Sequence, residues 1–231
     1  MLIAEDLLLL LTDDETGKHV VGSPGLDLVL AGANLVELAE RGKVDVAGQG
    51  EAVRSGRIVV RDGSPTGEPL LDETLRRCVD KQGKKPDAVL QTLGKGVRKD
   101  LLAGLAARGL LRAQEGRVLG IFSTTRWPTV DSAHERQVHE LIISALVHGT
   151  TPDQRTASLI ALLSPVDAAH KVVDHEAHGV DRKTIKNRAK EIREGAWAAG
   201  AVVKAIEAIQ AAVTTAIIMS TVTGAAAAGG T

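Results

Sequence analysis

Two basic residues close together in the sequence give its strongest indication of binding chemistry. Lys95 and Arg98 are three positions apart, which places them on one face of any helix that contains both. Gly94 and Gly96 flank Lys95 and leave the backbone amides there without side-chain cover. Two cations beside exposed amides can hold a phosphate group through charge-assisted hydrogen bonds. We therefore predict an anion site at Lys95 and Arg98, while a solvated basic helix face remains the competing interpretation.

An apolar hairpin is the second candidate for a functional element. The sequence predicts strands over 110–112 and 118–122, which meet in a turn at Glu115 and Gly116. An apolar tip close to tryptophan and arginine is typical of a segment that enters a membrane interface. The same hairpin would also be explained by packing on a helical core. The predicted membrane-facing residues are Val118, Leu119, Ile121, Phe122 and Trp127.

Three further patterns do not support chemistry. The segment 174–178 contains His175 and His178, but no additional ligand pattern for zinc accompanies them. The glycines around Lys95 lack the spacing and the Ser/Thr of a nucleotide phosphate loop. Cys78 follows two arginines, yet no Cys–His arrangement is recognisable, so we interpret it as structural. We expect no catalytic residue, no metal site and no cofactor, and hence no enzyme.

Helices are the elements that must position these residues. Apolar residues at helical spacing predict helices over 26–40, 70–78 and 89–107 and from 132 onwards, and residues 2–11 read as a buried helix or strand. Alternating residues over 43–61 predict a β-hairpin or a small meander. Gly42 and Gly109 each follow an arginine and suit the left-handed position that ends a helix. The predicted fold class is mainly α: a single helical-bundle domain with peripheral β-hairpins.

Composition limits the class of protein. Of the 231 residues, 44% are hydrophobic and 25% charged, which is typical of a folded globular protein. The net charge is −1, but residues 76–100 carry eight basic residues against three acids, and residues 182–193 carry six against one. Such local patches on a near-neutral chain indicate a directed anionic contact, or else solvated helix faces. A single cysteine excludes an internal disulfide and fits the cytoplasm.

The two ends of the chain do not read as targeting or spanning segments. The apolar start of the chain carries two acids and no basic region, unlike a signal peptide. Residues 208–231 are uncharged, but they are rich in Ala and Thr rather than strongly apolar. We expect a packed or frayed helix there, followed by a disordered end, with a domain over 1–210 and a tail over 211–231. The Ala- and Gly-rich composition is typical of a high-GC bacterial genome.

Several segments, in order, resemble the Golgi phosphoprotein 3 family over about residues 2–206. The most distinctive is the string Pro-Thr-Gly-Glu-Pro-Leu-Leu-Asp-Glu over 65–73. The others are residues 35–42, 97–111 and 155–167. The resemblance implies a mainly helical domain that binds phosphatidylinositol 4-phosphate on membranes and inserts a hydrophobic hairpin, here about residues 110–122. Eukaryotic members of this family also recruit glycosyltransferase tails and coat components.

The resemblance also implies a phosphate pocket. In the family this pocket uses a tryptophan and a basic residue of the first helical region, together with two basic residues three apart. Lys95 and Arg98 match the pair, while Gly22 and Ala31 stand where the family has the tryptophan and the other basic residue. Two of the four positions therefore differ, so we expect relaxed headgroup selectivity.

We expect a cytoplasmic protein that binds peripherally to the cytoplasmic face of a membrane. Its expected partners are anionic membrane lipids, and a membrane-protein client or self-association through the hairpin stays open. We expect no specific binding to a nucleic acid. The alternative is a winged-helix-like DNA-binding regulator, because helix, Arg-Gly and strand recur at 35–44 and 102–111. A scaffold that binds proteins through aliphatic surface is a third interpretation.

Overall fold

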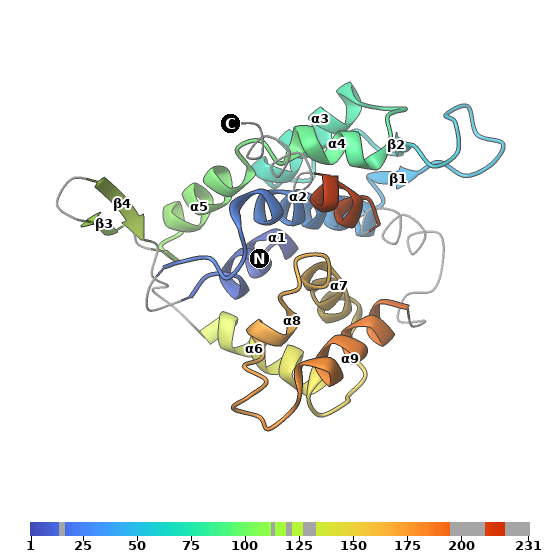
Figure 1. The fold of residues 1–231 in the computed structure, drawn as a ribbon. Coiled ribbons are helices and arrows are strands. Elements are labelled where there is room, and N and C mark those ends of the chain that lie inside the picture. Colours follow the sequence, from blue (N-terminus) through green and yellow to red (C-terminus); the bar gives the residue numbers. More distant parts are fainter. Residues whose placement is uncertain (14–16, 112–113, 119–121, 127–132, 195–210, 220–231) are drawn as a thin grey trace, which may run out of the picture.

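The fold is mainly helical, with two small antiparallel hairpins at its edge. The computed structural model describes residues 1–13, 17–111, 114–118, 122–126, 133–194 and 211–219. The sequence prediction of a helical domain with peripheral hairpins is confirmed (Figure 1). The elements are α1 (Ile3–Leu10), α2 (Ser23–Glu40), β1 (Val44–Val46), β2 (Ile58–Val60), α3 (Pro69–Asp80), α4 (Pro86–Leu93), α5 (Val97–Ala107), β3 (Gln114–Val118), β4 (Phe122–Arg126), α6 (Ala133–Leu146), α7 (Gln154–Leu163), α8 (Ala169–Val172) and α9 (Arg182–Glu194).

The helices α1 and α2 form the centre of the core. Every residue of α1 is buried, and α2 is buried from Leu28 to Ala39. Figure 1 shows α3, α4 and α5 along one side of this pair and α6 to α9 on the other side. The core is built from Leu, Ile, Val and Ala, as the scarcity of aromatic residues predicts. Because aliphatic side chains are small, the helices can approach one another closely.

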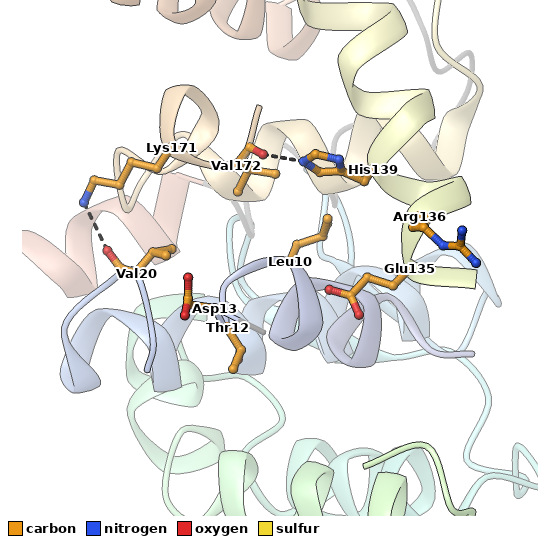
Figure 2. A pocket seen from close by; sticks show the side chains of 9 residues that line it. All are labelled: Leu10, Thr12, Asp13, Val20, Glu135, Arg136, His139, Lys171 and Val172. Atoms are coloured by element: carbon orange, nitrogen blue, oxygen red, sulfur yellow. Dashed lines mark hydrogen bonds between the residues drawn. The ribbon is translucent and has the colours of Figure 1, made fainter. Parts of the chain in front are cut away.

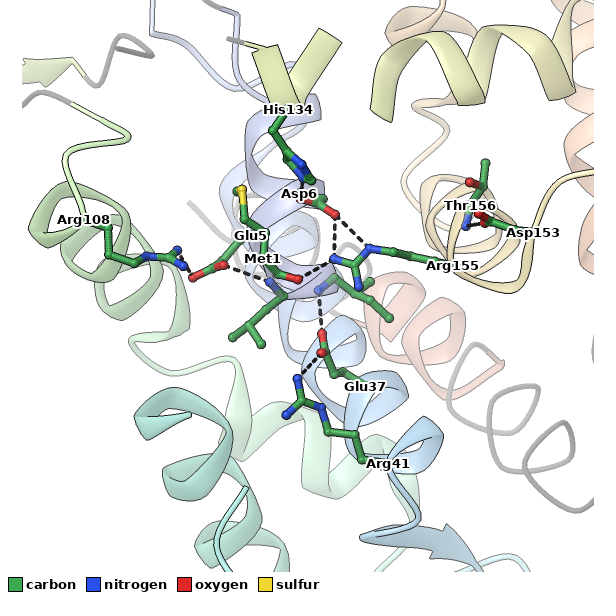
Figure 3. A network of polar contacts seen from close by, with 12 residues as sticks. Met1, Glu5, Asp6, Glu37, Arg41, Arg108, His134, Asp153, Arg155 and Thr156 are labelled. Atoms are coloured by element: carbon green, nitrogen blue, oxygen red, sulfur yellow. Dashed lines mark hydrogen bonds and ion pairs between the residues drawn. The ribbon is translucent and has the colours of Figure 1, made fainter. Parts of the chain in front are cut away.

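Buried carboxylates on α1 hold the two sides of the molecule together. The fully buried Asp6 side chain accepts hydrogen bonds from Arg155 of α7, at 2.7 and 3.2 Å, and lies 2.8 Å from Nε2 of His134 of α6 (Figure 3). Glu5, next to it, pairs with Arg108 at the end of α5. A buried carboxylate is tolerated only when such partners replace its water shell. The acids in the apolar N-terminal segment therefore join α1 to three other helices.

The distinctive string over 65–73 forms a loop that is locked onto α3. The Asp72 carboxylate accepts hydrogen bonds from both the backbone N–H and the hydroxyl of Thr66, each at 2.6 Å. These bonds lower the pKa of Asp72. Pro69 then starts α3, where its missing N–H leaves no helical hydrogen bond unmade. The motif thus has a local structural explanation, and it joins the β1–β2 hairpin to the helical body.

Two sequence predictions of local structure are wrong. The single helix predicted over 89–107 is two helices, since α4 ends at Leu93 and α5 begins at Val97. Gly96 has a φ of 83°, a left-handed conformation that a continuous helix cannot contain. The second hairpin is displaced along the chain: Glu115 pairs with Thr125 inside the ladder rather than forming the turn.

Residues 211–219 form a further helix that packs against α2 (Figure 1). Val213 is fully buried, and its Cγ2 would lie only 2.5 Å from a Cβ placed on Gly32. Gly32 is therefore required for this close approach, since any side chain there would push the two helices apart. The opposite face of the helix exposes Ile218 and Met219. The proposed division of the chain at residue 210 stays a prediction.

Candidate functional site

The start of α2 and the start of α5 meet at the surface, and this junction holds the predicted anion site. Arg98, the second residue of α5, donates from Nη1 to Oγ of Ser23, the first residue of α2, at 3.1 Å. Neither helix has a side-chain cap at its N-terminus. The N-terminus of a helix presents free N–H groups and positive dipole charge, both of which favour an anion. Two uncapped helix starts and an arginine therefore lie side by side.

Gly94 lets the turn between α4 and α5 lie against α2. A Cβ on Gly94 would sit 3.5 Å from the Asp27 carbonyl oxygen and 3.3 Å from that of Leu90. The backbone of α2 and the 94–96 turn are thus in close contact, which brings Arg98 to Ser23. Sequence reasoning predicted a role for these glycines in baring the backbone at Lys95. In the structure Gly94 lets the turn fit onto α2, and Gly96 supplies the left-handed φ between α4 and α5.

Lys95 and Arg98 do not share a helix face, so that part of the sequence prediction is wrong. Lys95 lies in the turn before α5, with its side chain exposed. Its carbonyl accepts a hydrogen bond from Arg77 at 3.4 Å. Its ammonium forms no ion pair with any residue that the structure describes. Lys95 is therefore free to meet a ligand, whereas Arg98 is already engaged by protein groups.

Asp27 is a carboxylate within the site that sequence reasoning missed. Its Oδ1 lies 3.3 Å from Nε of Arg98, yet among the described residues this buried oxygen has no hydrogen-bond partner. Burial raises the pKa of Asp27, and the nearby Arg98 cation partly opposes that increase. A carboxylate here weakens the positive potential at Arg98. The arginine is thus held in place, but part of its charge is neutralised.

His19 is a second group near Arg98 that the sequence did not indicate. Its Nδ1 lies 3.0 Å from the Thr12 hydroxyl. Burial, and then the positive charge of Arg98, lower the pKa of His19 below its usual 6.5. The ring is therefore neutral at pH 7, and its protonation reports the potential around Arg98. No sequence pattern links residues 19, 23, 27 and 98, because only the fold brings them together.

The two family positions that differ lie in contrasting surroundings. Gly22 has an ordinary φ of −65°, and a Cβ there would meet nothing within 4 Å. It lines an open cavity of about 560 Å³, together with Val21, Pro24 and Ile217. Ala31 is fully buried in the core. A large side chain therefore fits at Gly22, whereas a basic residue at Ala31 would have to displace packed core side chains.

The predicted membrane-facing residues lie mostly outside the described part of the chain. Leu119, Ile121 and Trp127 are not among the described residues. Val118 and Phe122 form the last register pair before the segment that joins β3 to β4. Figure 1 shows this hairpin apart from the helical body, next to α5. Val118 and Phe122 therefore lie together at one end of the ladder, and the role of the five predicted residues in a membrane stays a prediction.

The remaining candidates have structural explanations. Burial raises the pKa of the Cys78 thiol to about 12, so very little reactive thiolate forms at neutral pH. His175 donates from Nδ1 to the carbonyl of Val180 at 2.9 Å, and no group of three ligands for a metal occurs among the described residues.

A cavity of about 250 Å³ lies between the end of α1, α6 and α8 (Figure 2). His139 and Lys171 line it, and both donate to backbone carbonyls, those of Val172 and Val20. These two side chains of the cavity wall are therefore already engaged by the protein. The wall also carries the acids Asp13 and Glu135, so its charge is mixed and does not indicate an anion site.

Comparison with known proteins agrees with the resemblance seen in the sequence. None of the described helices has the length and apolar character needed to cross a membrane. Vacuolar protein sorting-associated protein 74 of Eremothecium gossypii is 28% identical over 165 residues, which are 63% of this chain and 49% of that protein. The chain thus spans about half the length of this curated relative. The family model for Golgi phosphoprotein 3, GPP34, matches residues 3–209, and the chain belongs to the Golgi phosphoprotein 3 family.

Proposed function

We propose that this protein is a non-enzymatic peripheral membrane protein that binds anionic phospholipid headgroups at the junction of α2 and α5. The observation that carries the proposal is the contact between Arg98 and Ser23, which brings two uncapped helix starts together. Lys95 stands beside this junction with a free ammonium group. A phosphate there would accept hydrogen bonds from backbone N–H groups and from both cations.

The hairpin supplies the second part of the proposed mechanism. After headgroup capture, the apolar residues around the β3–β4 connection, with Leu119 and Ile121 at their centre, enter the interface between headgroups and acyl chains. A basic residue near an anionic leaflet contributes about 1 kcal/mol. Complete burial of an Ile- or Phe-sized side chain contributes roughly 1.5–3 kcal/mol. Two to four such cations and part of a hairpin end therefore give weak, reversible and salt-sensitive docking.

Selectivity for one headgroup is expected to be relaxed. The open space at Gly22 and the buried Ala31 leave Lys95 and Arg98 as the basic side chains of the site. Asp27 also stands close to Arg98 and disfavours highly charged headgroups by repulsion. We therefore expect binding to generic anionic vesicles, with only a modest preference for phosphatidylinositol 4-phosphate.

The test is co-flotation with vesicles of phosphatidylcholine and phosphatidylserine. The double variant Lys95→Gln/Arg98→Gln should lose at least tenfold in affinity, while the control Lys84→Gln/Lys85→Gln loses the same charge from nearby exposed positions and should change little. Asp27→Asn should bind more tightly than the natural protein, because it removes the carboxylate that opposes the ligand. Equal binding by both double variants would contradict the proposed site.

A further inference from the structure

A basic cleft lies against α9. It is separate from the junction of α2 and α5 and lies on the other side of α1 and α2. It has a volume of about 350 Å³ and is formed between α9 and the segment that joins α7 to α8. Lys186, Lys190 and Arg193 line it, at positions i, i+4 and i+7 of α9, so they point from one side of that helix. This side runs next to the buried face of α9, which packs Ile185 and Ile192 into the core. The position of the three cations is therefore fixed by the packing of α9.

Asp167 is the one acidic residue that lines the described cleft, and its carboxylate is already paired with two cations. It accepts from Arg182 at 2.5 Å and pairs with Lys186 at 2.8 Å. Although burial acts to raise the pKa of Asp167, its bonds to Lys186 and Arg182 lower it overall. The carboxylate is therefore ionised at neutral pH. It holds the Lys186 ammonium at one end of the cleft.

The other two cations lack an equivalent partner. Lys190 is exposed and forms no ion pair with any described residue. Among the described residues, Arg193 pairs only with the exposed Glu194, its neighbour in sequence, at 3.3 Å. A contact of this type contributes little. Like charges at i and i+4 destabilise a helix. The repulsion among Lys186, Lys190 and Arg193 thus destabilises α9 by itself. Their positive potential is concentrated in a concave site.

We propose that this cleft binds a phosphate group, held by Lys190 and Arg193 with Lys186 at its edge. The proposal does not rest on the lipid site at α2 and α5, and it assigns a separate function to α9. A phosphate suits the site because several oxygens can accept from lysine and arginine at once. The volume admits a phosphate together with part of the molecule that carries it. That molecule is either a soluble phosphate compound or the headgroup of a lipid.

The test uses inorganic pyrophosphate in the Lys95→Gln/Arg98→Gln background, where the site at α2 and α5 is disabled. Calorimetric titration should give saturable binding. Lys190→Gln added to this background should weaken binding about tenfold, which corresponds to about 1.4 kcal/mol. The matched control is Lys183→Gln, which removes the same charge from an exposed position of α9 outside the cleft. It should change the affinity less than twofold.

Vesicles containing phosphatidic acid distinguish the two sources of phosphate. If Lys190→Gln weakens both pyrophosphate and vesicle binding, the ligand is a lipid headgroup. If it weakens pyrophosphate alone, the ligand is soluble. Absence of saturable pyrophosphate binding, or equal weakening by Lys183→Gln and Lys190→Gln, would overturn the proposal. Flotation of the Lys95→Gln/Arg98→Gln protein tests the lipid site separately, so the two proposals can fail independently.

Discussion

Arg98 interacts with more groups of the candidate lipid site than any other described side chain. It bonds to Ser23 and lies beside Asp27. After burial, it is the second cause of the lowered pKa of His19. A phosphate that binds here must share Arg98 with Asp27. This competition is consistent with a weak site, and it means that the affinity can be increased as well as decreased by single substitutions.

Gly22→Trp should increase affinity for phosphatidylinositol 4-phosphate. The backbone at Gly22 suits any residue, and the space around it is open, so the tryptophan causes no strain. The ring would supply the aromatic residue that the family resemblance places here. We expect a several-fold gain in flotation with vesicles containing this lipid and an unchanged melting temperature.

The matched comparison is Ala31→Arg, at the other position where the chain differs from the family. Because Ala31 is fully buried, an arginine there must displace packed core side chains and bring a charge into the core. This variant should fail to fold or melt at a much lower temperature. A stable Ala31→Arg protein, or a Gly22→Trp protein that binds no better, would contradict the assigned geometry.

Headgroup binding should become stronger as the pH falls from 7.5 to 5.5. Arg98 helps to keep the pKa of His19 below 6.5, and a bound anion offsets that cation. The pKa of His19 then rises on binding, so binding takes up a proton and is favoured by acid. With phosphatidylglycerol, whose phosphodiester keeps its charge in this range, we expect an increase of about two- to threefold.

His19→Gln is the control for this effect, since the chain contains six other histidines. The variant should bind with nearly the same affinity at both pH values. If the increase persists in His19→Gln, another group is responsible and His19 does not sense the ligand.

At the level of elements, the helix over 211–219 depends on one glycine of α2. Gly32→Ala alone should destabilise the protein, because the new Cβ would lie 2.5 Å from Cγ2 of Val213. Alanine is otherwise better than glycine within a helix by about 0.8–1 kcal/mol. In a Val213→Ala background, which removes the clashing methyl group, Gly32→Ala should therefore be neutral or stabilising.

Urea denaturation of the four proteins in this cycle measures the coupling. The expected result is a reversal of sign between the two backgrounds. If Gly32→Ala has the same effect with Val213 and with Ala at 213, the helix does not pack on α2 as described.

The elements also show what sequence patterns can predict. The helices that start at Ser23 and Pro69, the first hairpin and the stops at Gly42 and Gly109 follow from periodicity and turn residues, and they are confirmed. Asp153 caps α7 by accepting from Thr156 N–H at 2.7 Å. The break at 94–96 was missed because apolar spacing continues across it. Gly94 and Gly96, two glycines inside a helical pattern, were the sequence feature that could have indicated the break.

At the scale of the whole molecule, the sequence indicated the fold better than it indicated the site. The spacing of Lys95 and Arg98 predicts an anion site, but the junction of α2 and α5 is what brings Arg98 to Ser23. Asp27 and His19 lie about 70 to 80 positions from Arg98 in the chain, so no local pattern could reveal their proximity. The same holds for the bonds of Asp6 to α6 and α7, which only the assembled core explains.

Vesicle co-flotation of the natural protein tests the central claim most directly. Neutral vesicles, generic anionic vesicles and vesicles with phosphatidylinositol 4-phosphate are compared at low and high salt. The account predicts no binding to neutral lipid, binding to both anionic compositions with little preference between them, and clear weakening by salt. Absence of binding to every vesicle would contradict it and would mean that this chain keeps the family fold without a lipid function.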